Sequence, residues 1–186
     1  MGVYYLGDEN MVKALKAGDS SAFEGLLDSY GDRILKACSI ILKDLPAAED
    51  AVQEVFIQIY KSIGKFKGES SLYTWIYRIA VNKCRDIIKK RNEYFSFDEE
   101  INIKSDDDIE LDVIGDMDRD RVRDMVLSLS PIYREAITLF YFEDLPIKDI
   151  CTILDQNEGT VKSKLHRARN ILRRVLVEED IEYGKR

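Results

Sequence analysis

Residues 147–174 read IKDICTILDQNEGTVKSKLHRARNILRR. Two short amphipathic patterns meet in this segment at Asp155, a residue type that tolerates the positive φ of a sharp turn. The small side chain of Cys151 allows two helices to approach closely, and Val161 supplies an apolar anchor on the second helix. This spacing predicts a helix-turn-helix. Its two helices are expected over residues 147–154 and 158–177.

The second helix of this motif is strongly basic. Between residues 158 and 174 it carries six Lys and Arg residues against Glu158 alone, a net charge of +5. Attraction to phosphates needs such a density of charge, and side chains near the start of an inserted helix reach base edges in the major groove. A solvated surface helix is the alternative. The turn, the small residue and the charge together favour a helix that reads duplex DNA.

The apolar residues upstream also recur at helical spacing, with almost no strand-like alternation. Ser20 and Ser21 are candidate N-caps for the first long helix. Asp44 and Pro46 are typical of the start of the next one. The helices are expected over residues 20–42, 44–63 and 72–91. The predicted fold class is therefore all-α.

Composition changes abruptly between residues 98 and 120. Here 11 acidic residues occur with only Lys104 and Arg119, a net charge of −9. A block this acidic has few residues able to join a core and indicates a solvated, flexible linker. We therefore predict two small helical domains joined by a flexible acidic linker, the C-terminal one a helix-turn-helix. The boundaries are residues 1–95, 96–120 for the linker, and 121–186.

The charge of the whole chain obscures this arrangement. With 28 Lys and Arg against 35 Asp and Glu in 186 residues, the net charge is −7. Taken alone, this value argues against nucleic acid as a partner. The distribution of charge argues for nucleic acid as a partner, because the acidic excess lies in the linker. Two basic helices remain elsewhere, over residues 74–91 and 158–174.

Two further surface patterns each leave two interpretations open. Residues 74–91 carry a net charge of +5 and lie among aromatic residues. Cations beside exposed aromatics bind unstacked bases, each stack contributing about 1–3 kcal/mol, but Trp75 and Tyr77 could equally be core aromatics. On the preceding helix, three polar residues at positions i, i+3 and i+4 share one outward face. This face is either only solvated or a binding surface. This face carries Asp50, Gln53 and Glu54.

The sequence offers little for catalysis, and we expect no enzymatic activity, no metal and no cofactor. Asp116, Asp118 and Asp120 open like an EF-hand loop, but Arg121 occupies the required glycine position. The acidic run 106–108 could hold magnesium for a nuclease, yet no general base lies near it. The three cysteines form no disulfide or metal pattern, and no apolar stretch approaches the roughly 20 residues of a membrane span. We expect a cytoplasmic protein with no small-molecule substrate and no membrane insertion.

Several short segments follow one another in a fixed order. They are residues 50–56 (DAVQEVF), 65–71 (KFKGESS), 74–82 (TWIYRIAVN) and 159–165 (GTVKSKL), with Arg-Ala-Arg at 167–169. In this order they resemble a bacterial RNA polymerase sigma factor of the extracytoplasmic-function (ECF) group, over nearly the whole chain. Two departures occur, since Asp-Ile-Cys at 149–151 replaces the usual Glu-Ile-Ala and Lys164 replaces the commoner Arg. Both keep charge or small size, so they bear on promoter sequence rather than on function.

The resemblance implies a role for each of three surfaces. The outward face of the second helix would bind the clamp helices of core RNA polymerase, through Asp50, Gln53 and Glu54. The loop and third helix would open the promoter's minus-ten element and hold an extruded base, through Lys65, Phe66, Tyr73, Trp75, Arg78 and Asn82. The recognition helix would read the minus-thirty-five element, through Thr160, Lys162, Ser163, Lys164, His166, Arg167 and Arg169.

The predicted function is thus that of a sigma factor, which binds core RNA polymerase, directs it to specific promoters and helps open the DNA. The acidic stretch 98–120, of about 23 residues, would let the two domains act up to roughly 75 Å apart on one duplex. The resemblance also implies a membrane-anchored anti-sigma factor as a partner. The alternative is a stand-alone helix-turn-helix regulator with no role at polymerase.

Overall fold

The computed structural model describes residues 8–91 and 119–183, and every regular element in these ranges is a helix. This confirms the all-α prediction. The N-terminal half contains α1 (Asp8–Lys16), α2 (Ser20–Leu42), α3 (Leu45–Ser62), the 3-10 turn η1 (Ile63–Lys65) and α4 (Leu72–Lys90). The C-terminal half contains α5 (Arg119–Ser128), α6 (Pro131–Ile137), the π-helical turn η3 (Thr138–Phe142), α7 (Ile147–Leu154) and α8 (Glu158–Tyr183).

Aspartates cap the two long helices of the N-terminal half. Asp44 caps α3 as predicted, and its Oδ1 accepts the backbone N–H of Ala47 at 3.0 Å. For α2 the prediction of Ser20 or Ser21 was wrong, because Asp19 lies one residue earlier and its Oδ1 accepts both the N–H and the hydroxyl of Ser21. These hydrogen bonds lower the pKa of Asp19. A carboxylate with extended backbone therefore outcompetes the neighbouring hydroxyls for the cap.

The helix-turn-helix is formed as predicted by α7 and α8. Asp155 follows α7 with φ 55° and ψ 50°, in the left-handed region expected for the turn. Val161 is fully buried and anchors the start of α8, while Cys151 is only half-buried. Asn157 Oδ1 accepts the backbone N–H of Thr160 at 2.8 Å, which satisfies a donor in the first turn of α8.

Three features of the fold had not been predicted from the sequence. Helix α1 precedes the first expected helix, and α8 continues to Tyr183 instead of ending near residue 177. The helix opened by Pro131 changes at Thr138 to π-helical spacing, in which the Glu143 N–H bonds the Thr138 carbonyl at 3.2 Å. A π turn inserts one extra residue and so rotates everything that follows it.

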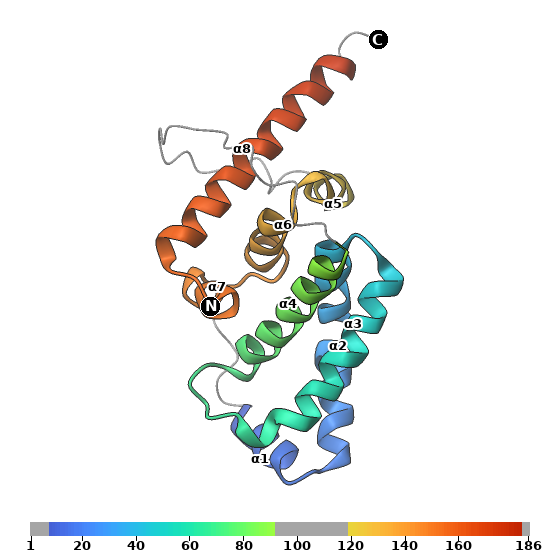
Figure 1. The fold of residues 1–186 in the computed structure, drawn as a ribbon, viewed down its shortest axis with the longest axis vertical. Coiled ribbons are helices and arrows are strands. Elements are labelled where there is room, and N and C mark those ends of the chain that lie inside the picture. The colour runs from blue at the N-terminus through green and yellow to red at the C-terminus, as the bar shows by residue number, and fades with distance from the viewer. Residues whose placement is uncertain (1–7, 92–118, 184–186) are drawn as a thin grey trace.

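Helix α4 lies at the centre of the molecule, between the α2–α3 pair and the C-terminal helices (Figure 1). It packs against α7, while α2 packs against α6 and η3. The buried apolar residues of both halves form one continuous core, from Leu15 on α1 to Leu172 on α8. Tyr77 on α4 is the largest side chain that this core encloses.

The two halves, α1–α4 and α5–α8, correspond to the two predicted domains, whose boundaries at residues 95 and 121 stay predictions. The linker predicted at 96–120 lies outside the described residues, except for its last two, which begin α5. Within the described ranges, no helix combines the length and the apolar character that crossing a membrane requires.

The left-handed turn residue provides a test of the helix-turn-helix geometry. An L side chain in this region costs roughly 1–2 kcal/mol, whereas glycine has no Cβ and avoids the cost. We expect Asp155→Gly to exceed Asp155→Ala in free energy of unfolding by about 1 kcal/mol. Urea denaturation of the two variants measures the difference. Equal stability of the pair would show that the turn does not require a positive φ.

Candidate nucleic-acid and polymerase interface

The outer face of α3 is open to solvent. All three residues of the predicted polymerase-binding set are exposed: Asp50, Gln53 and Glu54. Glu54 also forms an ion pair with Lys83 of α4. Further along the same helix, Ile57 and Tyr60 are 51% and 65% exposed. Sequence reasoning missed these two, although they continue the helical spacing of the outward face from Gln53.

A hollow between α3 and α4 gathers much of the predicted minus-ten set. Four of the six residues surround it: Lys65, Trp75, Arg78 and Asn82. The volume is about 300 Å³, and Gln58, Ser62 and Ile79 complete the lining. The indole of Trp75 is half-buried, whereas Lys65 and Arg78 are exposed. An aromatic wall with nearby cations and amides suits stacking and hydrogen bonding of a single unpaired base.

Sequence reasoning did not assign Gln58 and Ser62 to this hollow. They follow Glu54 by four and eight residues on α3, so the three share one side of the helix. Glu54 contacts α4 through Lys83, which places that side toward α4. Helical spacing from Glu54 was therefore a usable signal for both residues.

The remaining two residues of the minus-ten set, Phe66 and Tyr73, are buried at 8% and 7% exposure. The Phe66 ring packs on Trp75, with centroids 5.2 Å apart, and so supports the wall of the hollow from behind. The Tyr73 hydroxyl donates to Glu143 Oε2 at 2.7 Å. The expectation of exposed aromatics is thus wrong for these two in this conformation. Tyr77 is a core aromatic, one of the two interpretations left open.

The recognition helix α8 presents only part of its predicted DNA-binding set to solvent. The exposed members are Lys162, Ser163 and Arg167. Lys162 forms an ion pair with Glu158 at 2.7 Å, and its hydrogen bond and positive charge lower the pKa of Glu158. The half-buried members are Thr160, Lys164, His166 and Arg169.

Each half-buried member has a partner within the protein. Thr160 donates its hydroxyl to Asn157 Oδ1 at 3.0 Å, and His166 Nε2 lies 3.0 Å from the amide of Asn170. Arg169 Nε donates to the Tyr141 hydroxyl at 2.9 Å, and its guanidinium lies over the Phe140 ring. Lys164 is turned inward. Roles in DNA binding for these four stay predictions.

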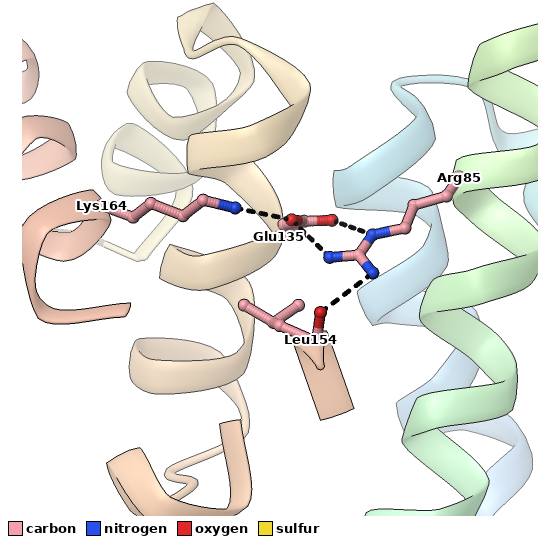
Figure 2. A network of polar contacts seen from close by, with 4 residues as sticks. All are labelled: Arg85, Glu135, Leu154 and Lys164. Carbon is pink, nitrogen blue, oxygen red and sulfur yellow. Dashed lines mark hydrogen bonds and ion pairs between the residues drawn. The ribbon is translucent and has the colours of Figure 1, made fainter. Parts of the chain in front are cut away.

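Lys164 meets a buried carboxylate that also binds the other domain. Its Nζ lies 3.3 Å from Glu135 Oε1, and the Glu135 side chain is 3% exposed (Figure 2). Arg85 of α4 approaches Glu135 from the opposite side, with Nε and Nη2 each 2.8 Å from a different carboxylate oxygen. Arg85 Nη1 also donates to the Leu154 carbonyl, at the end of α7, at 3.3 Å.

A second buried carboxylate, Glu143 after η3, makes the equivalent contact with α2 and α4. Its Oε2 accepts the hydroxyls of Tyr73 and Tyr77 at 2.7 and 2.6 Å, and Arg33 Nη2 lies 3.1 Å away. Burial, reinforced by the Glu143 charge, raises the pKa of Tyr77. Both phenols therefore remain protonated donors.

We call these two carboxylates and their partners in the N-terminal domain the interdomain clasp. Its members are Glu135, Glu143, Arg33, Tyr73, Tyr77 and Arg85. Sequence reasoning found none of these contacts, because each joins residues 50 or more positions apart. Among the described side chains, no cluster of His, Cys, Asp or Glu is suited to hold a metal ion.

The chain combines a basic helix-turn-helix with a second helical domain that carries a cation-lined hollow. This combination defines a two-domain helical transcription factor. Family models agree with both halves: residues 26–94 match "Sigma-70 region 2" and residues 119–172 match "Sigma-70, region 4". The ECF RNA polymerase sigma factor SigW of Bacillus subtilis is 33% identical over 176 residues, covering 89% of this chain and 94% of its own. The chain therefore belongs to the ECF sigma factors.

A further relative agrees with this membership, and two solved structures share the fold. The RNA polymerase sigma-H factor of Pseudomonas aeruginosa is 31% identical over 182 residues, covering 91% of this chain and 93% of its own. The Bartonella quintana sigma factor RpoE, solved in complex with the anti-sigma factor NepR, superposes with a TM-score of 0.64 at 25% identity, covering 83% and 96% of the two chains. CnrH, solved in complex with the cytosolic domain of CnrY, superposes with a TM-score of 0.69 at 20% identity, covering 92% and 97%.

The inward and outward lysines of α8 should differ in their effect on stability. Lys164→Ala removes one of the cations that neutralise buried Glu135, so we expect the free energy of unfolding to fall by about 1–3 kcal/mol. Lys162→Ala removes an exposed ion pair and should cost less than about 0.5 kcal/mol. Urea denaturation checks both variants. A loss of equal size in the two would contradict the inward position of Lys164.

Proposed function

We propose that this sigma factor acts in the cytoplasm, binds core RNA polymerase through the outer face of α3 and captures an extruded promoter base in the hollow between α3 and α4. The observation that carries the proposal is the hollow. It brings together Lys65, Trp75, Arg78 and Asn82, which are separated by up to 17 positions in the sequence. Extruding a base costs a few kcal/mol, which stacking on Trp75 and nearby cations would offset.

Exposure and composition support the proposed polymerase surface. Asp50, Gln53 and Glu54 are exposed, and the large apolar side chains of Ile57 and Tyr60 lie on the same helix. Aromatic and aliphatic contacts beside polar groups are typical of protein interfaces. The proposed partner for this face is the pair of clamp helices in the largest polymerase subunit.

The upstream promoter element would be read by α8 as duplex DNA. Lys162, Ser163 and Arg167 are exposed on the first turns of this helix, which is the part that enters the major groove in a helix-turn-helix. Arg and Lys pair bidentately with guanine, and Ser bonds any base or phosphate.

In the hollow, Gln58 and Asn82 supply the amides that would read the extruded base.

The family also supports an anti-sigma factor as a further partner of this chain. RpoE of Bartonella quintana, which resembles it over most of its length, was solved with such a partner. We assign no catalytic residue, metal or cofactor to this chain, since the family consists of transcription initiation factors. The acidic run 106–108, considered for a nuclease, lies outside the described residues.

Reconstituted transcription tests the proposal directly. Purified full-length protein is mixed with bacterial core polymerase on genomic DNA, and the 5′ ends of the transcripts are mapped. We expect initiation at discrete sites that share two sequence elements and that disappear without the protein. Binding to duplex DNA without any initiation would instead identify a stand-alone regulator.

Trp75 provides a sharper test of base capture. Stacking contributes about 1–3 kcal/mol per base, so Trp75→Ala should lower open-complex formation by about tenfold or more while duplex binding by α8 is unchanged. Trp75→Phe keeps an aromatic ring and should retain most of the activity. Permanganate reactivity of unpaired thymines measures opening, and gel shift measures duplex binding. Equal loss in both assays would count against the hollow as the capture site.

A further inference from the structure

We infer that α1 braces the loop that leads into α4, and that Lys16 is thereby a positioning residue for Trp75 in the hollow. The inference rests on the proposed function, because it concerns how the aromatic wall that would stack on an extruded base is held in place. Contacts in series carry it, from Lys16 to the Phe66 carbonyl and from the Phe66 ring to Trp75. Helix α1 contributes no residue to the three predicted binding surfaces.

The first contact joins α1 to the turn that follows α3. Lys16, the last residue of α1, donates from Nζ to the Phe66 carbonyl oxygen at 2.7 Å, across 50 positions of sequence. Phe66 closes the turn η1, because its own N–H bonds the Ile63 carbonyl. The ammonium group therefore lies at the carboxyl end of a helical turn, where the backbone dipoles favour a positive charge. A charged donor also makes a stronger hydrogen bond than a neutral one.

Helix α1 is anchored, so Lys16 acts from a fixed point. Leu15, its neighbour, is 1% exposed and belongs to the core, against which Met11 and Val12 also pack. The helix contacts both α2 and η1, beside the end of α3 (Figure 1). A helix of 9 residues is marginal when isolated, so this packing is what holds it in place.

The loop between η1 and α4 is fixed mainly at its two ends. Residues 67–69 are exposed, and Gly68 has a φ of 76°, in the region that glycine adopts without strain. A Cβ added to this glycine would meet no atom within 4 Å, so the backbone here is not packed against a neighbour. At the far end, Ser71 Oγ accepts the Thr74 N–H at 3.0 Å and caps α4. At the near end, the hydrogen bond from Lys16 holds the loop.

Phe66 passes the position of this near end to the hollow. Its ring is buried, and its centroid lies 5.2 Å from that of Trp75, with the two planes tilted by 50°. Lys16 holds the backbone of the same residue, so a shift of the turn also moves the ring behind the indole. Trp75 is only half-buried. A binding wall of this kind keeps its orientation only through the contacts that support it.

Four variants isolate the series of contacts. Lys16→Ala removes the donor, whereas Lys16→Arg keeps a long cationic donor and should restore the contact. Lys13→Ala is the matched control, because it removes the same charge from an exposed position in the last turn of the same helix. Phe66→Leu removes the second contact but keeps the backbone carbonyl. Because both changes act through one residue, adding Lys16→Ala to Phe66→Leu should cause little further loss.

The fluorescence of Trp75 reports the brace directly, since the chain contains a single tryptophan. The full-length protein is measured without polymerase or DNA, and circular dichroism checks that the helices are retained. We expect Lys16→Ala and Phe66→Leu to increase the quenching of Trp75 by acrylamide and to lower its anisotropy, because the indole gains freedom. Lys16→Arg and Lys13→Ala should match the wild type.

Opening of promoter DNA reports whether the brace matters for function. Core polymerase and each variant are assayed with permanganate at a start site mapped with the wild type. Lys16→Ala should lower open-complex formation by about threefold to tenfold, the range typical of contacts one step outside a binding site. Duplex binding by α8, measured by gel shift, should be unchanged. Lys16→Arg should open the promoter as the wild type does.

Each contrary result overturns the inference. Unchanged quenching and anisotropy in Lys16→Ala would show that Lys16 does not hold Trp75. A loosened Trp75 with normal opening, where Trp75→Ala is impaired, would show that the brace has no role in base capture. An equal loss of opening in Lys16→Ala and Lys13→Ala would show that the charge of α1 matters rather than its contact with Phe66.

Failure of the proposed function gives a different pattern. If the wild type directs no initiation, or if Trp75→Ala opens promoters normally, the hollow is not the capture site. The fluorescence of Lys16→Ala would still decide whether α1 positions Trp75, because that measurement needs neither polymerase nor DNA.

Discussion

The contact on which the rest of the arrangement depends is the bidentate pair between Arg85 and Glu135. One guanidinium bonds both oxygens of a buried carboxylate on α6 and the last carbonyl of α7, so a single side chain on α4 joins three helices from two domains. Charges removed from water are costly unless their geometry is satisfied, and the fork of arginine matches a carboxylate well. The apolar core supplies stability, while this pair specifies which face of one domain meets the other.

Electrostatics in this chain must be considered locally rather than as a sum. The net charge of −7 coexists with basic stretches on α4 and α8. The structure adds that some of these positive groups are paired with acids: Arg85 and Lys164 with Glu135, and Arg78 with Asp155. The charge that each basic helix presents therefore depends on these pairs as well as on composition.

What the sequence could predict is what is encoded locally. The positive φ at Asp155 and the cap at Asp44 follow from a few neighbouring residues, and both are present. Part of the lining of the hollow was predicted, because Trp75, Arg78 and Asn82 share one helix. Gln58 comes from another helix and was not assigned to it. The clasp was out of reach, because its arginine and carboxylate partners lie 50 and 110 positions apart. The contact of Lys164 with Glu135 was not predicted, because this lysine borders the buried stripe of α8, where helical spacing does not decide the direction of a long side chain.

The π turn at Thr138–Phe142 has a consequence for how the contact between the two halves is encoded. One residue more than an α-helical turn requires rotates the chain by about 100°, and Glu143 follows directly. The direction in which the Glu143 carboxylate points, toward Tyr73 and Tyr77, thus depends on the number of residues in the segment as much as on their identity. A related chain with the same acid but an uninterrupted α-helix here would point it elsewhere. Insertions and deletions in this segment, rather than substitutions, are the changes that would redirect this carboxylate.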